Sequence, residues 1–322
     1  MQYLIQTYIL SLTIFLCTTC TSRKHYSPID DLTTAQDIEA FVHKLNPKNR
    51  HFRINQSMYF EHPNCRQIVQ ALNPKPWYKI DLDQNGYTDL LIHSLWDKTN
   101  YVVALMAFKQ DQYKLKLLGN EACNCTRPIE KTKTPLLEFF HFNDSLYQKT
   151  WSEIMMTSRE YNRSPKAISN LDRDTLTYAF GDFIEYNPQI KPKEITAIHF
   201  KTISCLGHCP IFELNLKQDQ TATYHAIDDH LRKGHFKTRV NKNKFQEIMG
   251  LVQYMNVASL KNKYQKGSLQ EPTSELTITF KNGKQKKIKD TSYEGTRSLG
   301  RLYNLLIDLR KNQQWDRIRM KK

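Results

Sequence analysis

Apolar and polar residues alternate along much of the second half of the chain, which is typical of β-strands with one buried face. Two further stretches, residues 245–255 and 299–306, carry apolar residues at helical spacing. Asn282 and Gly283 separate the last two alternating runs and predict a tight hairpin there. The alternating runs are residues 194–203, 211–217, 221–227, 235–240, 274–280 and 284–289. This order predicts a ββββαββα arrangement, an antiparallel sheet with two helices on one face.

The first half of the chain mixes helical and strand patterns. Residues 33–45 open with a capping-box pattern at Thr33 and Gln36 and continue with helical spacing, so we expect a helix that stops before Pro47. A second short helix is expected at residues 65–72. Four apolar runs predict strands of one small sheet packed against these two helices, namely residues 77–80, 90–92, 101–108 and 112–118. The fold class expected for this half is also α+β.

The chain of 322 residues is long enough for two ordinary domains, each with its own core. Two prolines flank a short polar stretch near residues 187–193 and predict a boundary there. We therefore expect an N-terminal α+β domain over residues 30–187 and a C-terminal domain over residues 193–318. Residues 159–174 are polar and are expected to form a loop.

The N-terminus has the pattern of an export signal. Residues 1–19 contain no charged side chain, and residues 4–17 form an apolar run that is shorter than a dependable membrane span. Cys20 stands where a bacterial lipoprotein signal would be cut, so residues 1–20 predict a lipoprotein-type signal peptide with lipid on Cys20. An uncleaved N-terminal anchor is the alternative, because Arg23 and Lys24 follow the apolar run and no basic residue precedes it.

The net charge is strongly positive, with 47 Lys and Arg against 32 Asp and Glu, a formal +15. The basic residues are spread over both halves without a nucleic-acid-binding signature, so we expect no nucleic-acid partner. A solvated basic surface accounts for this distribution. Attraction to anionic lipid headgroups or envelope polymers is the functional interpretation.

Residues 81–89 read Asp-Leu-Asp-Gln-Asn-Gly-Tyr-Thr-Asp and predict a Ca²⁺ loop. Hard cations prefer oxygen ligands at alternating loop positions, and Gly86 permits the sharp turn that such a loop needs. The loop is similar to the calcium loops of integrin-type propeller repeats, which lack the Glu at position twelve of an EF-hand. The alternative is a β-hairpin with solvated Asp residues. The expected ligands are Asp81, Asp83, Asn85, Tyr87 through its carbonyl, and Asp89.

The remaining cysteines predict structural rather than catalytic roles. Cys65 lies on the apolar face of the second expected helix, so it either forms a disulfide or stays a buried thiol. Cys123 and Cys125 are too close for the paired knuckles of a zinc ribbon, and pairing with Cys65 is their better use.

Residues 205–210 read Cys-Leu-Gly-His-Cys-Pro at the junction of the first two strands of the C-terminal half. A disulfide between Cys205 and Cys209 is the main prediction, because Gly207 lets the loop close and an oxidising envelope favours the bond. A copper site that includes His208 and a redox-active dithiol are the alternatives. Both are weakened because the pattern after Pro210 is that of a strand, whereas copper chaperones and dithiol oxidoreductases need a helix there.

The same residues resemble an uncharacterised domain family of secreted lipoproteins from Bacteroidetes-type bacteria, whose pattern is Cys-x-Gly-x-Cys-Pro followed by an apolar strand. The resemblance covers about residues 194–316 and includes Tyr224, Gly234 and Trp315. Residues 77–91 are similar to the region that accompanies this domain in some members, which implies a pair formed by Cys65 and Cys125. The family implies an envelope address and assigns no activity.

The catalytic motifs of hydrolases, metalloproteases and nucleotide-binding enzymes are absent from the sequence, and its eleven His residues are scattered. We therefore expect a non-enzymatic, lipid-anchored protein of the outer membrane or periplasm that binds or scaffolds an envelope protein or polymer. Ca²⁺ is the one expected cofactor. The alternative is a periplasmic thiol-redox or copper-handling protein that uses Cys205 and Cys209.

Overall fold

A computed structural model describes most of the chain after the N-terminal segment. The described residues are 24–58, 66, 69–70, 72–96, 99–109, 111–119, 125–129, 132–142, 171–203, 209–265, 272–291, 293 and 295–319. The structure is mixed α+β, as predicted, with sheets as its larger part. No helix within these residues is long and apolar enough to span a membrane.

The first described elements form a small helical layer. Thr34 caps the N-terminus of α1, because its hydroxyl accepts a hydrogen bond from the amide of Asp37 and the Asp37 carboxylate accepts one from the amide of Thr34. The expected capping box at Thr33 and Gln36 is thus shifted by one residue. The elements of this layer are η1 (Pro28–Asp31), α1 (Ala35–Leu45) and η2 (Pro47–His51).

The N-terminal sheet is antiparallel, with the order β1-β3-β4-β5 and with β2 also paired to β3. One face of it packs against α1 through residues such as Ile38, Val42 and Leu90. The strands are β1 (Phe52–Ile54), β2 (Trp77–Ile80), β3 (Asp89–Trp96), β4 (Thr99–Lys109) and β5 (Gln112–Gly119).

A second antiparallel sheet covers the opposite face of the first, which the sequence did not predict. Leu91 and Met106 of the first sheet pack there with Phe139 and Leu176 of the second. Of the second expected helix, residues 66, 69, 70 and 72 are described and are helical. The expected loop at residues 159–174 is corrected, because β8 begins within it. The strands of the second sheet are β6 (Cys125–Pro128), β7 (Leu136–Phe142), β8 (Leu171–Ala179) and β9 (Asp182–Glu185).

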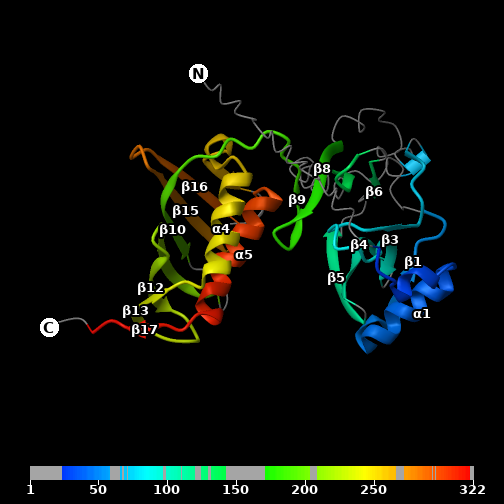
Figure 1. The fold of residues 1–322 in the computed structure, drawn as a ribbon, viewed down its shortest axis with the longest axis horizontal. Coiled ribbons are helices and arrows are strands. Elements are labelled where there is room, and N and C mark those ends of the chain that lie inside the picture. Colours follow the sequence, from blue (N-terminus) through cyan, green and yellow to red (C-terminus); the bar gives the residue numbers. More distant parts are fainter. Residues whose placement is uncertain are drawn as a thin grey trace, which may run out of the picture.

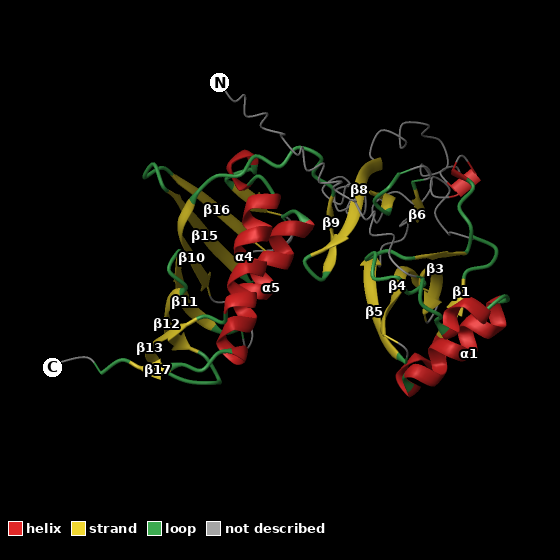
Figure 2. Ribbon diagram, viewed as in Figure 1, coloured by secondary structure: helices red, strands yellow, loops and turns green. Residues whose placement is uncertain are grey.

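The C-terminal half contains an eight-stranded sheet with the order β14-β16-β15-β10-β11-β12-β13-β17. Two helices, α4 (Lys242–Tyr254) and α5 (Arg297–Asn312), lie against one of its faces (Figures 1 and 2). The strands are β10 (Ile195–Ile203), β11 (Ile211–Lys217), β12 (Thr221–Asp228), β13 (Gly234–Arg239), β14 (Lys263–Gln265), β15 (Thr273–Phe280), β16 (Gln285–Thr291) and β17 (Asp316–Arg317).

Alternation of buried and half-buried residues along β10, β11 and β12 directs every second side chain into this core, where Phe200, Phe212 and Tyr224 are fully buried. Gly283 has a φ of 77° in the hairpin between β15 and β16, a left-handed conformation that glycine adopts without a steric cost. The two outer strands β14 and β17 were not expected from the sequence.

The hairpin of β8 and β9 contacts both halves of the molecule. Phe183 packs in the core between the two N-terminal sheets, while Ile184 packs in the C-terminal core. Glu185 accepts hydrogen bonds from the amides of Arg297 (2.5 Å) and Ser298 (3.0 Å) at the N-terminus of α5. A carboxylate in this position is favoured by the unpaired amides and the dipole of the helix.

Candidate functional site

The Asp-rich loop connects β2 to β3, which pair antiparallel so that Ile80 lies opposite Asp89. Gln84 and Gly86 have φ values of 60° and 90°, and these left-handed residues turn the chain back on itself. The loop thus connects the two strands as a wide hairpin.

Asp81, Asp83 and Asp89 converge at the base of this loop. One carboxylate oxygen from each lies within 4.8 Å of the others. Among the described residues, these three are the group of Asp, Glu, His or Cys side chains that are close enough together to hold a metal ion. The amides of Asn85 and Gly86 donate to the Asp81 carboxylate at 3.1 and 2.9 Å. The backbone therefore holds the carboxylates together despite their mutual repulsion.

Asp89 is the deepest of the three, with a completely buried side chain. Burial raises its pKa to about 7, against the hydrogen bonds from the amides of Ala107 (2.7 Å) and Leu82 (2.8 Å), and the nearby Asp83 and Asp81 add to the increase. Burial likewise raises the pKa of Asp83, with a further contribution from Asp81. The loop thus concentrates negative charge that a cation would neutralise.

The side chains of Asn85 and Tyr87, the other two predicted ligand residues, make contacts of their own. The side-chain oxygen of Asn85 accepts a hydrogen bond from the amide of Tyr87, and its nitrogen donates to Asp83 and to the carbonyl of Ala107. The ring of Tyr87 stacks on His25 with 4.9 Å between centroids. Asn85 therefore braces the loop, while the ring contact of Tyr87 does not involve the backbone carbonyl that was the predicted ligand.

The loop is fastened to the first described segment of the chain. The amide of His25 donates to the carbonyl of Gly86 (2.8 Å), and the hydroxyl of Thr88 donates to the Asp30 carboxylate (2.6 Å). Lys79 donates to the carbonyl of Asp30 (2.8 Å). A cavity of about 510 Å³ lies beside these contacts, lined in part by Lys24, Asp30 and Asp81. The segment that follows the predicted anchor therefore rests on the loop.

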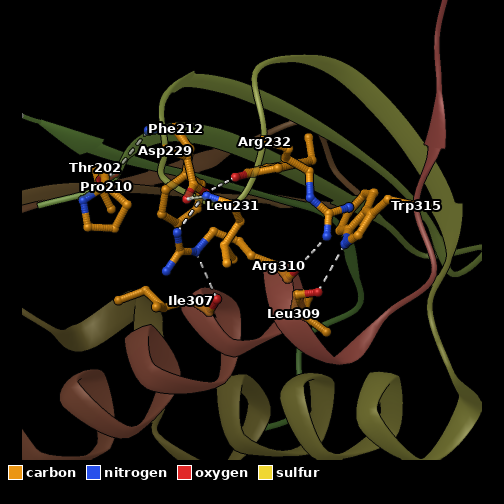
Figure 3. Close-up of polar contacts among 11 residues, drawn as sticks. Thr202, Pro210, Phe212, Asp229, Leu231, Arg232, Ile307, Leu309, Arg310 and Trp315 are labelled. Atoms are coloured by element: carbon orange, nitrogen blue, oxygen red, sulfur yellow. Dashed lines mark hydrogen bonds and ion pairs between the residues drawn. The ribbon is translucent and has the colours of Figure 1, made fainter.

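The strands that flank the cysteine loop are joined by Thr202. Its hydroxyl donates to the carbonyl of Pro210 (2.6 Å) and accepts from the amide of Phe212 (3.1 Å), as Figure 3 shows. Cys205 lies outside the described residues, so its bond to Cys209 stays a prediction. Thr202 adds to the backbone pairing that holds the ends of β10 and β11 together, a role that the sequence did not indicate.

A buried polar network lies behind this end of the sheet (Figure 3). Arg310 of α5 forms an ion pair with Asp229 at 2.6 Å, and Tyr224 donates a hydrogen bond to the same carboxylate. Arg310 also lies over the ring of Phe212, 4.8 Å from its centroid. Burial opposes the charged form of Asp229, but hydrogen bonds from the amide of Leu231, from Tyr224 and from Arg310 hold its pKa below the usual range. The network joins α5 to the sheet beside the cysteine loop.

Cys125 is a buried free thiol whose pKa is raised by burial to about 12. It packs with Met58, Val69 and Leu72. As a free thiol, Cys125 does not form the expected bond to Cys65, which itself lies outside the described residues. Cys20 also lies outside them.

A separate cavity of about 430 Å³ opens at the far end of the C-terminal sheet, between α4 and the chain that precedes β10. Its apolar floor includes Val252, Val257 and Phe280, and Lys193 lies over the Phe280 ring, 5.5 Å from its centroid. Asn256 holds the wall in place, because its side chain accepts from the amide of Lys191 and donates to the carbonyl of Gln189, both at 3.0 Å. A concave apolar floor with a few polar groups is typical of ligand pockets.

Comparison with known proteins identifies one domain. A family described as "Domain of unknown function (DUF6438)" matches residues 196–310, which lie within the range of the resemblance seen in the sequence. Neither a curated protein nor a solved structure matches the chain. The match supports a defined C-terminal domain and leaves the function to be argued from the site.

Two features of the C-terminal domain were missed by sequence reasoning. Arg310 continues the buried stripe of Tyr303 and Leu306 along α5, and a charged residue at such a position could have indicated a buried partner. Nothing local to Asp229 distinguishes it from its exposed neighbour Asp228.

Proposed function

We propose that this chain is a lipid-anchored protein of the cell envelope, at the outer membrane or facing the periplasm, that binds or scaffolds other envelope molecules and does not catalyse a reaction. In this proposal Ca²⁺ binds the loop at residues 81–89 and stiffens the connection between the anchor and the folded body. The observation that carries it is the convergence of Asp81, Asp83 and Asp89 beside the segment that follows the predicted anchor.

Calcium suits the chemistry of this loop. The three carboxylates are hard oxygen donors, and the carbonyl of Tyr87 is a further donor within the same loop. An ion bound there would remove the repulsion among the carboxylates and favour the charged form of Asp89. Because Gly86 and Thr88 hold His25 and Asp30, order in the loop would extend to the chain next to the anchor.

The test is the melting temperature of the protein with millimolar CaCl₂ and with a chelator. A ligand that binds only the folded state stabilises it by about 2.7 kcal/mol at a concentration 100 times its dissociation constant, so we expect a clear rise with calcium. Asp83→Asn should abolish the rise, because it removes one carboxylate from the group. Asp308→Asn, a matched change on the exposed side of α5, should keep it.

Equal responses of the wild type and Asp83→Asn, or no response of the wild type, would leave only a β-hairpin at residues 81–89. Isothermal titration calorimetry measures the heat of calcium binding directly. It therefore distinguishes a loop that binds calcium with little change in melting temperature from a loop that does not bind calcium.

The anchor has its own experiment. Replacement of Cys20 by Ser should move the protein from the membrane fraction to the soluble envelope fraction, because acylation at Cys20 is the proposed attachment. Persistent membrane association of this variant, without signal processing, would favour an uncleaved anchor.

We also propose that the chain is organised as two domains, residues 30–187 and 193–318, and that Cys205 and Cys209 form a structural disulfide, as in the Bacteroidetes-type lipoprotein family that the sequence resembles. Support for the first point comes from two separate cores, one around Ile38 and Leu90 and one around Phe200. The disulfide is tested by measuring the intact mass of protein that has never been exposed to reductant, because the mass shows whether the two thiols are bonded. Two free thiols or bound copper would favour the thiol or copper-handling alternative.

The ligand that we propose for the C-terminal domain carries negative charge. The cavity floored by Val252 and Phe280 has two Lys residues, Lys191 and Lys193, in its lining and no acidic residue in that lining. The net charge of +15 acts in the same direction. An envelope protein or polymer with acidic groups is the partner class that fits both observations.

A further inference from the structure

Two histidines, distant from the calcium loop and the cysteine loop, face each other on the open side of the C-terminal sheet. His225 on β12 lies directly opposite His235 on β13. Their rings are stacked with 3.9 Å between centroids and 11° between planes, and both side chains are half-buried. The two rings are therefore in face-to-face contact.

Backbone pairing explains why the two rings are so close. The carbonyl of His235 accepts a hydrogen bond from the amide of Ile318, next to β17, on the side of β13 away from β12. In an antiparallel ladder a residue directs its amide and carbonyl to the same side, so His225 and His235 form a non-hydrogen-bonded pair. Side chains of such pairs approach each other most closely, and the strand beyond β13 keeps this pair away from the free edge of the sheet.

We propose that His225 and His235 together bind one late first-row divalent metal ion, with Cu²⁺, Ni²⁺ and Zn²⁺ as the class that imidazole pairs select. Zinc–imidazole bonds are about 2.0–2.1 Å long, so two nitrogens on one tetrahedral ion lie roughly 3.3 Å apart. Because an imidazole binds a metal through a lone pair in its ring plane, both rings must rotate out of their stacked arrangement for two nitrogens to converge on one ion. The remaining positions on the ion are open to water or to a ligand.

One carboxylate lies in the same row of side chains as the pair. Glu213 on β11 lies opposite His225 and continues the same row of side chains. Glu213 forms an ion pair with Lys201 at 3.1 Å, so its negative charge is partly balanced. The row thus presents two imidazoles beside one carboxylate, on a sheet face that the helices leave uncovered (Figure 1).

The site is independent of the proposed calcium loop, and its test uses residues outside that loop. Nickel binding to the full chain is measured by isothermal titration calorimetry, and Cu²⁺ is used in pulsed electron paramagnetic resonance to count coordinated imidazoles. We expect one Ni²⁺ site and two imidazoles on copper. His225→Gln and His235→Gln should each weaken nickel binding by at least about tenfold, since the effect of losing a ligand exceeds that of losing a supporting contact.

Two features of the design keep the test decisive. His199→Gln is the matched control, because His199 lies on the same sheet face opposite Asn215 and has no histidine across from it; its nickel affinity should equal that of the wild type. The double variant should bind no more weakly than either single variant, because one imidazole alone does not hold the ion.

Several outcomes would overturn the proposal. These are single variants that bind nickel like the wild type, a His199→Gln variant that loses as much affinity, or copper spectra with fewer than two imidazoles. Half-buried positions on the open face should tolerate Gln, and melting temperatures in chelator check this. If one variant is destabilised, the other and the imidazole count still decide.

Discussion

The two large sheets of this protein differ in how many of their faces are covered. In the N-terminal sheet, β3 has six consecutive buried residues from Asp89 to Ser94, because α1 lies on one face and the second sheet on the other. In the C-terminal sheet, β11 alternates between buried and half-buried residues, because the helices of the described residues lie on one face only. Continuous burial therefore marks a sheet inside a sandwich, and alternation marks a sheet with an open face.

The difference decides what polar side chains do. On the buried side they must be paired, as Asp229 is with Arg310 behind the C-terminal sheet. On the open face they form rows of opposite charge, such as Lys289 with Glu275 at 3.7 Å. The comparison predicts large effects for changes at covered positions and small effects at open ones.

The largest effect is expected for Asp229→Ala. Removal of one partner from a buried ion pair leaves the other charge unpaired, which costs about 3–5 kcal/mol of unfolding free energy. Urea denaturation measures this cost. Replacing Asp229 and Arg310 together by apolar residues should recover part of the loss, and a double variant that is as unstable as Asp229→Ala would show that the charge left on Arg310 is not the cause.

Acid should destabilise the N-terminal half through His93. This ring is fully buried between the carbonyl of Lys75 (2.9 Å from Nδ1) and the amide of Thr126 (3.1 Å from Nε2), and burial lowers its pKa from 6.5 to about 4. The unfolded chain therefore binds a proton below pH 6.5 that the folded chain refuses, so the contribution of His93 to stability falls as the pH drops from 6.5 to 4. Asp89 acts in the opposite direction over this window, because its raised pKa lets the folded chain bind a proton that the unfolded chain does not.

The size of this loss is roughly 3 kcal/mol, from 1.36 kcal/mol per pKa unit. The difference between the denaturation curves of the wild type and His93→Gln at several pH values measures it, because the opposite contribution of Asp89 is common to both. The stability of His93→Gln relative to the wild type should rise as the pH drops across this window. Equal slopes would mean that other groups carry the acid sensitivity.

A smaller effect is expected where the two halves meet. Glu185→Gln weakens the hydrogen bonds to the amides of Arg297 and Ser298, and loss of such a capping interaction costs about 1 kcal/mol. Thermal unfolding of this variant should also become less cooperative, because Glu185 connects β9 to α5. An unchanged transition would mean that the apolar contacts of the hairpin suffice.

The smallest effect is expected on the open face. Glu275→Gln removes the ion pair with Lys289, and exposed pairs contribute about 0–1 kcal/mol. Its unfolding free energy, measured as for Asp229→Ala, should stay close to that of the wild type. A loss as large as that at Asp229 would contradict the distinction between covered and open faces.

The parts of the fold that were predicted depend on neighbours in the sequence. The alternation around Phe212 and Leu214 marked β11, and Asn282 with Gly283 marked the hairpin between β15 and β16. The second N-terminal sheet was missed, because its apolar runs have no clear periodicity. Continuous apolar residues from Val102 to Ala107 in β4 could have indicated a strand covered on both faces.

The candidate sites divide in the same way. Asp81, Asp83 and Asp89 lie within nine residues of one another, so a single turn at Gly86 is enough to bring them together and the sequence alone indicated it. His225 and His235 are joined by one hairpin, but their approach depends on the register of β12 and β13, which the sequence did not specify.

By itself, then, the sequence determined the local features: the alternation of strands, the helical stripes, the turns and the Asp-rich loop. These depend on backbone geometry and side-chain spacing over a few residues. Only the tertiary structure decided which faces are covered and which distant groups meet, such as Asp229 and Arg310, which are 81 residues apart. The physical reason is that burial and ion pairing depend on packing between segments, and no pattern within either segment specifies its partner.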